Sequence, residues 1–333
     1  MALICQGLVR NTALISLGSR LEKMFDGLFD FLQNILLPIK WVIEQILVFF
    51  HTLLGFLGFG DKSGLSWALS IVGLVIVIRA TLIPVFLKQI RAQRKMLEIA
   101  PEVRRIQEKY KGKRDVLSRQ SMNQEMMEIY RVRGANPLSS CLPIVLQMPV
   151  FFGLYQVIES AQNAGTGVGP LNGPLGMDFR DSRIFGVVPL HDSFSHDFYA
   201  LQAGQAFNLI TMIVAGVLTA IMIAVQLFTQ LKVIPKNIPE NAKNTSVYKN
   251  QKVMLYLLPI MFLGMGFSFP VGILIYWTAS NVWSAVQQAV AIYRNPSPGS
   301  LAFELRRKRL GVQNKKTKGQ RQQPVNKRRA KRR

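Results

Sequence analysis

Long apolar segments dominate this sequence and limit it to folds that lie in a membrane. Five of them, each of about 17 to 25 residues, are long enough to cross a hydrocarbon core of about 30 Å. Together they contain one charged residue, Arg79, and they lie at residues 65–87, 138–158, 206–228, 253–269 and 271–293. We therefore predict an all-α polytopic membrane protein with a five-span core bundle.

The segments between these spans differ in charge, which predicts the orientation. Residues 88–133 hold thirteen basic and six acidic side chains, and residues 229–252 hold five and one, whereas residues 159–205 hold two and five. Short basic loops stay on the cytoplasmic side, so we expect the first two segments inside and the third outside. The last 29 residues, 305–333, hold fourteen basic residues and no acidic one, which predicts that residues 295–333 form a disordered cytoplasmic tail.

The N-terminal segment, residues 1–64, has a weaker pattern. Residues 28–58 are apolar with polar interruptions, and Lys40 and Glu44 have the i, i+4 spacing of a helical ion pair. An interfacial amphipathic helix fits this pattern best, and a sixth span is the alternative. No cleaved signal peptide or lipoprotein signal is expected, and translation could begin at Met1 or at Met24.

Residues 92–133 combine many charges with an apolar residue at every third or fourth position, as at Met96, Ile99 and Val103. This spacing predicts a cytoplasmic helical hairpin, with its turn near Gly112. On the other side, residues 161–176 are rich in Gly and Pro, so irregular structure is expected there. Pro270 leaves almost no connection between the last two spans, which predicts a tight antiparallel pair.

Arg79 is the residue that most constrains function. It precedes Lys88 by nine residues, which is roughly 13 Å along a helix, and a charge at that depth costs about 2.5 to 3.5 kcal/mol. No core span contains an Asp, Glu or His to pair with it. The alternative is snorkelling to the interface, which a stem of about 6 to 7 Å could achieve only with local deformation of the bilayer. We therefore expect a hydrated cavity around Arg79.

Several polar residues in other spans could line this cavity. They are Gln147, Asn208, Thr211, Thr219, Gln226, Ser280 and Asn281. Each has a second interpretation, because Ser, Thr and Asn often bond between packed membrane helices without lining a cavity.

The sequence contains no motif for ion-coupled transport, catalysis or metal binding. The absence of acidic residues from the spans weighs against proton-coupled or cation-coupled transport. Cys5 and Cys141 have no paired spacing, and no nucleophile–base pair, zinc cluster or phosphate loop occurs. We expect no catalysis, no cofactor and no metal, with His191 and His196 as surface residues.

Several runs of residues resemble the YidC family of membrane protein insertases, which includes the Oxa and Albino insertases of organelles. They include Ile76 to Arg79 with Pro84, Gln124 to Met127, Asn136-Pro137-Leu138, Gln147-Met148-Pro149, Pro270-Val271-Gly272, Tyr276-Trp277 and Ser280-Asn281. The resemblance covers residues 65–294. The lack of a large domain before Leu65 is similar to the short Gram-positive or actinobacterial type.

The resemblance implies a helical bundle around a hydrophilic groove whose single arginine corresponds to Arg79. It assigns substrate contact to Tyr276 and Trp277, and we add Gln147, Thr219 and Asn281 as groove residues. The implied function is insertion and folding of integral membrane proteins in the bacterial cytoplasmic membrane, alone or with the Sec translocon. The expected partners are nascent membrane proteins, the Sec translocon, the lipid bilayer and, through the basic tail, the ribosome.

Two other classes of function are compatible with the residues. A small-solute transporter or channel would use Arg79 to bind an anion. An assembly chaperone would only dock to the Sec translocon and help spans to pack.

Overall fold

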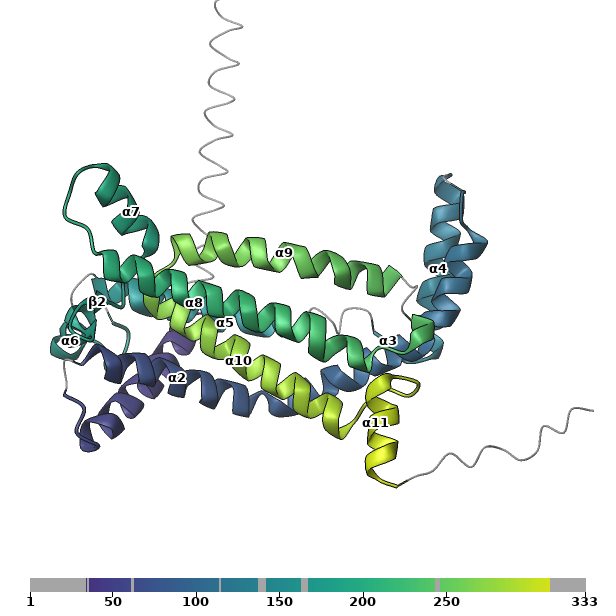
Figure 1. Cartoon of the computed structure of the whole chain (residues 1–333), viewed down its shortest axis with the longest axis horizontal. Coiled ribbons are helices and arrows are strands. Elements are labelled where there is room, and N and C mark those ends of the chain that lie inside the picture. Colours follow the sequence, from purple (N-terminus) through teal and green to yellow (C-terminus); the bar gives the residue numbers. More distant parts are fainter. Residues whose placement is uncertain are drawn as a thin grey trace, which may run out of the picture.

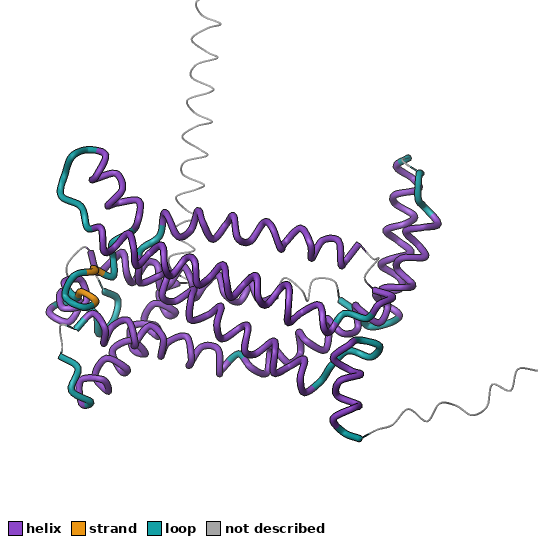
Figure 2. The backbone as a smooth tube through the Cα atoms, viewed as in Figure 1, coloured by secondary structure: helices purple, strands orange, loops and turns teal. Residues whose placement is uncertain are grey.

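The computed structural model describes residues 34, 36–60, 63–113, 115–136, 142–162, 167–242 and 246–311. The expectations for Met1, Met24, Cys5, Cys141 and residues 312–333 lie outside these residues. The described chain is almost entirely helical, with one small β-hairpin at one end (Figure 2).

Five long helices lie side by side and form the body of the molecule (Figure 1). They are α2 Gly64–Thr81, α5 Leu142–Gln162, α8 Leu209–Phe228, α9 Ser246–Ser268 and α10 Val271–Arg294. Their positions follow the five apolar stretches of the sequence. By length and composition, α2 and the segment Leu209–Asn237 could cross a membrane, and Leu255–Ser268 is a shorter apolar helix. The fold is therefore an all-α bundle suited to a membrane.

The first apolar stretch does not form one continuous helix to residue 87. Helix α2 ends at Thr81, and α3 Ile83–Lys109 begins after Leu82 with Pro84 in its first turn. Proline has no N–H to donate to the preceding turn and fits the first turn of a new helix. Arg79 thus lies in the last turn of α2 rather than in the middle of a longer span.

A further helix, Leu36–Phe56, packs against the bundle and also has the length and composition of a membrane span. The ring of Phe50 lies directly over Gly73 of α2, and Ile43 lies over Gly153 of α5. Small residues allow such close helix approach in membranes. Whether this helix crosses the membrane or lies on its surface remains a prediction.

The expected ion pair between Lys40 and Glu44 is not formed, although both side chains are buried. The Glu44 carboxylate instead accepts hydrogen bonds from the backbone N–H groups of Val168 (3.0 Å), Gly169 (2.7 Å) and Leu171 (3.3 Å). Three backbone donors satisfy a buried carboxylate better than one flexible ammonium. Glu44 therefore anchors the loop that the sequence suggested would be irregular.

An ordered cap covers the end of the bundle to which Glu44 binds (Figure 1). It contains α6 Pro174–Asp181, the antiparallel strands β1 Arg183–Ile184 and β2 Val188–Pro189, and α7 Phe194–Gln202. The cap is joined to the start of α10, because Gly272 N–H donates to the Leu190 carbonyl at 2.8 Å. Residues 167–173 form turns and bends, as the Gly and Pro content of residues 161–176 indicated, and the regular elements begin at Pro174.

At the opposite end, α3 and α4 Val116–Val132 form a hairpin that projects from the bundle (Figure 1). The turn between them includes Gly112 at a φ of +85°, which glycine adopts without strain. The apolar residues of both helices meet in a small core that contains Ile99, Val103 and Met126. The side of the membrane on which this hairpin lies remains a prediction.

The beginning of the C-terminal tail is helical, which corrects the expectation of disorder for all of residues 295–333. Helix α11 Leu301–Arg309 begins at Ser300, whose hydroxyl accepts from Phe303 N–H at 3.3 Å. The Arg309 guanidinium carbon lies 3.9 Å from the centroid of the Tyr293 ring, a cation–π contact that ties α11 to α10. Near α11, α8 continues into π- and 3₁₀-helical turns, Thr229–Val233, Ile234–Asn237 and Glu240–Ala242.

We predict that Gly266→Ala destabilises the bundle and that Gly264→Ala does not. A Cβ at residue 266 would lie 2.8 Å from the Thr219 Cβ of α8, whereas a Cβ at residue 264 meets nothing within 4 Å. Overpacking costs about 1 to 3 kcal/mol, while alanine at an open helical site is neutral or stabilising. Thermal unfolding of the purified variants in detergent measures this difference. Equal midpoints for the two variants would contradict the α8–α9 contact.

Candidate functional site

Arg79 is a buried cation in the last turn of a bundle helix, with 9% of its surface exposed. It lies in the last turn of α2, where the negative end of the helix dipole favours a cation. Its guanidinium carbon is 5.6 Å from the centroid of the Phe86 ring on α3. The helix break at Leu82 thus lets residues on both sides of it surround the charge.

No carboxylate of the described residues forms an ion pair with Arg79 within 4.0 Å. Its guanidinium interacts electrostatically with the phenol of Tyr276 on α10. A neutral hydroxyl stabilises a guanidinium less than a carboxylate does. The site therefore holds a positive charge that is only weakly compensated by the protein.

Tyr276 connects two helices at this site. It is 1% exposed, and its hydroxyl accepts a hydrogen bond from Gln147 Nε2 of α5. One turn further along α10, Ser280 is 5% exposed, and its hydroxyl lies near the Tyr276 hydroxyl. Arg79, Gln147 and Tyr276 are thus brought together from α2, α5 and α10.

Trp277 follows Tyr276 but belongs to a separate aromatic cluster. Its ring stacks on Phe151 with a centroid distance of 4.9 Å and an interplanar angle of 15°, and Phe269 meets it edge-on at 5.1 Å. Tyr155 adds another edge contact with Phe269 at 5.8 Å. Successive residues of a helix are about 100° apart, so Trp277 and Tyr276 face different surroundings.

The remaining groove candidates have different local roles. Thr219 is 7% exposed, and its hydroxyl donates to the Ala215 carbonyl one turn earlier at 2.7 Å. Its side chain also packs against Gly266 of α9, so it contributes to the α8–α9 contact. Asn281 is half-buried on α10 next to Ser280, and Gln226 is half-buried near the end of α8. No hydrogen bond links these three residues to Arg79.

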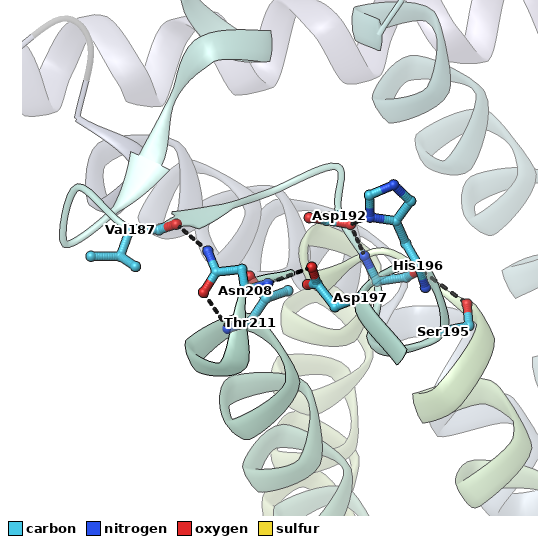
Figure 3. A network of polar contacts seen from close by, with 8 residues as sticks. Val187, Asp192, Ser195, His196, Asp197, Asn208 and Thr211 are labelled. Carbon is cyan, nitrogen blue, oxygen red and sulfur yellow. Dashed lines mark hydrogen bonds and ion pairs between the residues drawn. The ribbon is translucent and has the colours of Figure 1, made fainter. Parts of the chain in front are cut away.

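Asn208 uses its polar atoms at the capped end of the bundle. Its Oδ1 accepts from the N–H groups of Ile210 (3.1 Å) and Thr211 (3.3 Å), and its Nδ2 donates to the Val187 carbonyl at 2.8 Å. It is therefore the N-cap of α8 and a link to the cap, as Figure 3 shows. The hydroxyl of Thr211 is buried and has no partner among the described residues.

A second buried polar contact was not expected from the sequence. His51 Nδ1 lies 2.8 Å from the Ser66 hydroxyl, and its ring stacks on Trp67 at 3.8 Å. His51 belongs to Leu36–Phe56 and the other two residues to α2. The sequence around Ser66 and Trp67 gives no signal for this contact, because only packing identifies the helix that carries His51.

Comparisons with known proteins place most of the chain in one group. Residues 58–297 match the family model described as 60Kd inner membrane protein. The membrane protein insertase YidC of Streptomyces avermitilis is 39% identical over 280 residues, which cover 83% of this chain and 61% of the relative. Insertases of the same name are 32% identical in Bifidobacterium longum and 31% in Mycobacterium tuberculosis H37Rv. The Bifidobacterium alignment covers 82% of that protein and 85% of this chain. The Mycobacterium alignment covers 73% of that protein and 78% of this chain.

We predict that Gln147 and Tyr276 are energetically coupled. Gln147→Leu removes the donor, Tyr276→Phe removes the acceptor, and each leaves a buried partner unsatisfied at a cost of about 1 to 3 kcal/mol. The double variant should lose less stability than the sum of the two, as measured by thermal or denaturant unfolding in detergent. Tyr256→Phe, at a tyrosine that is 71% exposed on α9, is the matched control and should change nothing. Additive losses would contradict the hydrogen bond.

Proposed function

The chain belongs to the 60Kd inner membrane protein family, the YidC insertases, and from this premise we propose that it inserts other membrane proteins into a lipid bilayer. The alignment spans 61% of the Streptomyces relative, which is less than two thirds of that protein. The function therefore has to be supported by residues of this chain. The observation that carries the proposal is Arg79, a buried cation with no carboxylate partner among the described residues.

The proposed site is a hydrated groove beside Arg79. A buried guanidinium needs water or hydrogen-bond acceptors, and the described residues offer the Tyr276 hydroxyl as its electrostatic partner. The Ser280 hydroxyl, one turn along α10 from Tyr276, is also buried. Water in the groove would satisfy these groups together. We assign Arg79, Gln147, Thr219, Tyr276, Trp277 and Asn281 to its lining.

In the proposed mechanism, Arg79 attracts an acidic or polar tail of a nascent membrane protein from the cytoplasm. The groove shortens the apolar path that the tail must cross. A membrane potential that is positive outside assists each acidic residue by about 2.3 kcal/mol per 100 mV. This gain is comparable to the insertion cost of one carboxylate, about 2.5 to 3.5 kcal/mol.

The apolar part of the client leaves along the aromatic and aliphatic surface of α5 and α10. Met148 is 45% exposed and Phe152 is 42% exposed on α5, next to the ring cluster that contains Trp277. Contact with these side chains replaces water around the client by apolar surface and then by lipid. Insertion by this route requires no nucleotide at this protein.

The proposed topology places the α3–α4 hairpin and the C-terminus in the cytoplasm and the cap with α6 and α7 outside. The bundle α2, α5, α8, α9 and α10 forms the five spans, and Leu36–Phe56 is either a sixth span or an interfacial helix. The positive-inside rule supports this orientation through the basic residues of α3, α4 and α11.

Two partners follow from the same arrangement. The Sec translocon would share clients with this protein in the bilayer. The ribosome would bind the basic segment that begins with Arg306, Arg307, Lys308 and Arg309 of α11, because clustered cations bind RNA through counterion release. Removing the chain from residue 305 onward should weaken ribosome co-sedimentation in low salt, with insertion preserved.

We predict that Arg79→Ala reduces insertion of a single-spanning protein with a short acidic tail into liposomes that contain only the purified protein. A hydrogen-bonded charge interaction is worth about 1.5 to 3 kcal/mol, so the rate should fall at least roughly tenfold. Protection of the tail from external protease measures insertion. Ile76→Ala, at a residue that is 47% exposed one turn earlier on α2, is the control and should insert normally.

The other outcomes identify the alternatives. Equal protection with Arg79→Ala would keep the insertase function and remove charge attraction from it. No insertion with any variant, combined with anion flux through wild-type liposomes, would favour a transporter. Insertion that appears only when the Sec translocon is added would favour an assembly chaperone.

A further inference from the structure

Three ligand-type side chains converge in the cap, between β2 and the first turn of α7. Asp192, His196 and Asp197 each offer one ligand atom, and these atoms all lie within 4.8 Å of one another. Asp192 Oδ1 and His196 Nδ1 are 2.8 Å apart. Figure 3 shows the two carboxylates and the imidazole at this junction, beside Asn208.

The backbone that carries these side chains is fixed at several points. The Asp192 carbonyl accepts from Val271 N–H of α10 at 2.8 Å, and the Ser193 hydroxyl accepts from His196 N–H at 3.2 Å as the N-cap of α7. Asp197 Oδ1 accepts from Asn208 N–H at 2.7 Å. The three ligand-type side chains therefore start from positions set by α7, α8 and α10, which is the preorganisation that a metal site requires.

One atom of this cluster has no partner. Asp197 is 2% exposed, and its Oδ2 is buried without a hydrogen bond in the part of the chain that the structure describes. A buried carboxylate oxygen beside a second carboxylate needs a proton or a cation to neutralise it.

We propose that Asp192, His196 and Asp197 bind a divalent cation of the zinc type. Zn²⁺ binds imidazole nitrogen and carboxylate oxygen at about 2.0 to 2.2 Å, which places tetrahedral ligands about 3.4 Å apart. Asp192 Oδ1 and His196 Nδ1 are 2.8 Å apart, and no two of the three ligand atoms are more than 4.8 Å apart. These separations bracket the tetrahedral value. Small side-chain rotations would bring all three atoms to one ion. Ca²⁺ fits less well, because it prefers six to eight oxygen ligands.

Access and the remaining coordination position also fit this ion. The side chain of His196 is 71% exposed, whereas that of Asp192 is 13% exposed. A cation from solution would therefore reach the site past the imidazole, and a water molecule could complete a tetrahedral set of three protein ligands. Bound metal would clamp the start of α7 to the Asn208 cap of α8 and to the start of α10. This role concerns the stability of the cap and is independent of client insertion.

The test uses the full chain in detergent, stripped with a chelator and titrated with ZnCl₂ by calorimetry and by thermal unfolding. We expect one Zn²⁺ per chain and a higher unfolding midpoint. His196→Ala and Asp197→Asn should each bind Zn²⁺ at least tenfold more weakly and lose the shift in midpoint. His191→Ala, five residues before His196 in the same loop, is the matched control and should bind as the wild type does.

Asp197→Asn keeps an oxygen that can accept from Asn208 N–H, so its fold should be preserved. If it nevertheless unfolds, the exposed His196→Ala variant alone decides the question. The proposal is overturned if the wild type binds no Zn²⁺ stoichiometrically, if His196→Ala binds with unchanged affinity, or if Ca²⁺ binds as tightly as Zn²⁺.

Discussion

The weakly compensated charge of Arg79 is the constraint on which the rest of this structure depends. Among the described residues it is buried at 9% exposure with no carboxylate within ion-pair distance. The Phe86 ring centroid lies 5.6 Å from its guanidinium carbon, and the Tyr276 phenol is its electrostatic partner. In an apolar bundle such a group is stable only with water or a polar neighbour. The break between α2 and α3 and the hydrogen bond from Gln147 to Tyr276 both serve to build that polar surrounding.

The two ends of the bundle satisfy their polar groups differently. At the cap, Glu44 accepts three backbone hydrogen bonds, and Asn208 caps α8 while it bonds to Val187. Near Arg79, the buried Tyr276 hydroxyl accepts from Gln147, and the buried Ser280 hydroxyl lies one turn further along α10. The cap also holds two buried polar atoms without a partner in the described chain, Asp197 Oδ2 and the Thr211 hydroxyl.

Much of the architecture follows from the sequence because its causes are local. The length of the apolar segments predicts the five bundle helices. The spacing of Ile99 and Val103 predicts the apolar contact within the hairpin of α3 and α4, and Gly112 predicts its turn. Contacts between distant segments could not be read in the same way. The i, i+4 spacing of Lys40 and Glu44 suggested an ion pair, but backbone amides 124 to 127 residues away bind Glu44 instead. The cluster of Asp192, His196 and Asp197 likewise becomes visible only once α7 and α8 are placed.

Access of water to the interior beside Arg79 is the most direct test of this account. With Cys5 and Cys141 replaced by Ser, single cysteines at Ser280 and Val282 of α10 are treated with a charged, membrane-impermeant thiosulfonate in liposomes. Ser280 is 5% exposed in the bundle and Val282 is 43% exposed, so packing alone predicts that only Val282→Cys reacts. A hydrated groove predicts the reverse, because the reagent needs an ionised thiol in water and Val282 would face lipid. Reaction at Val282→Cys with none at Ser280→Cys would contradict the account.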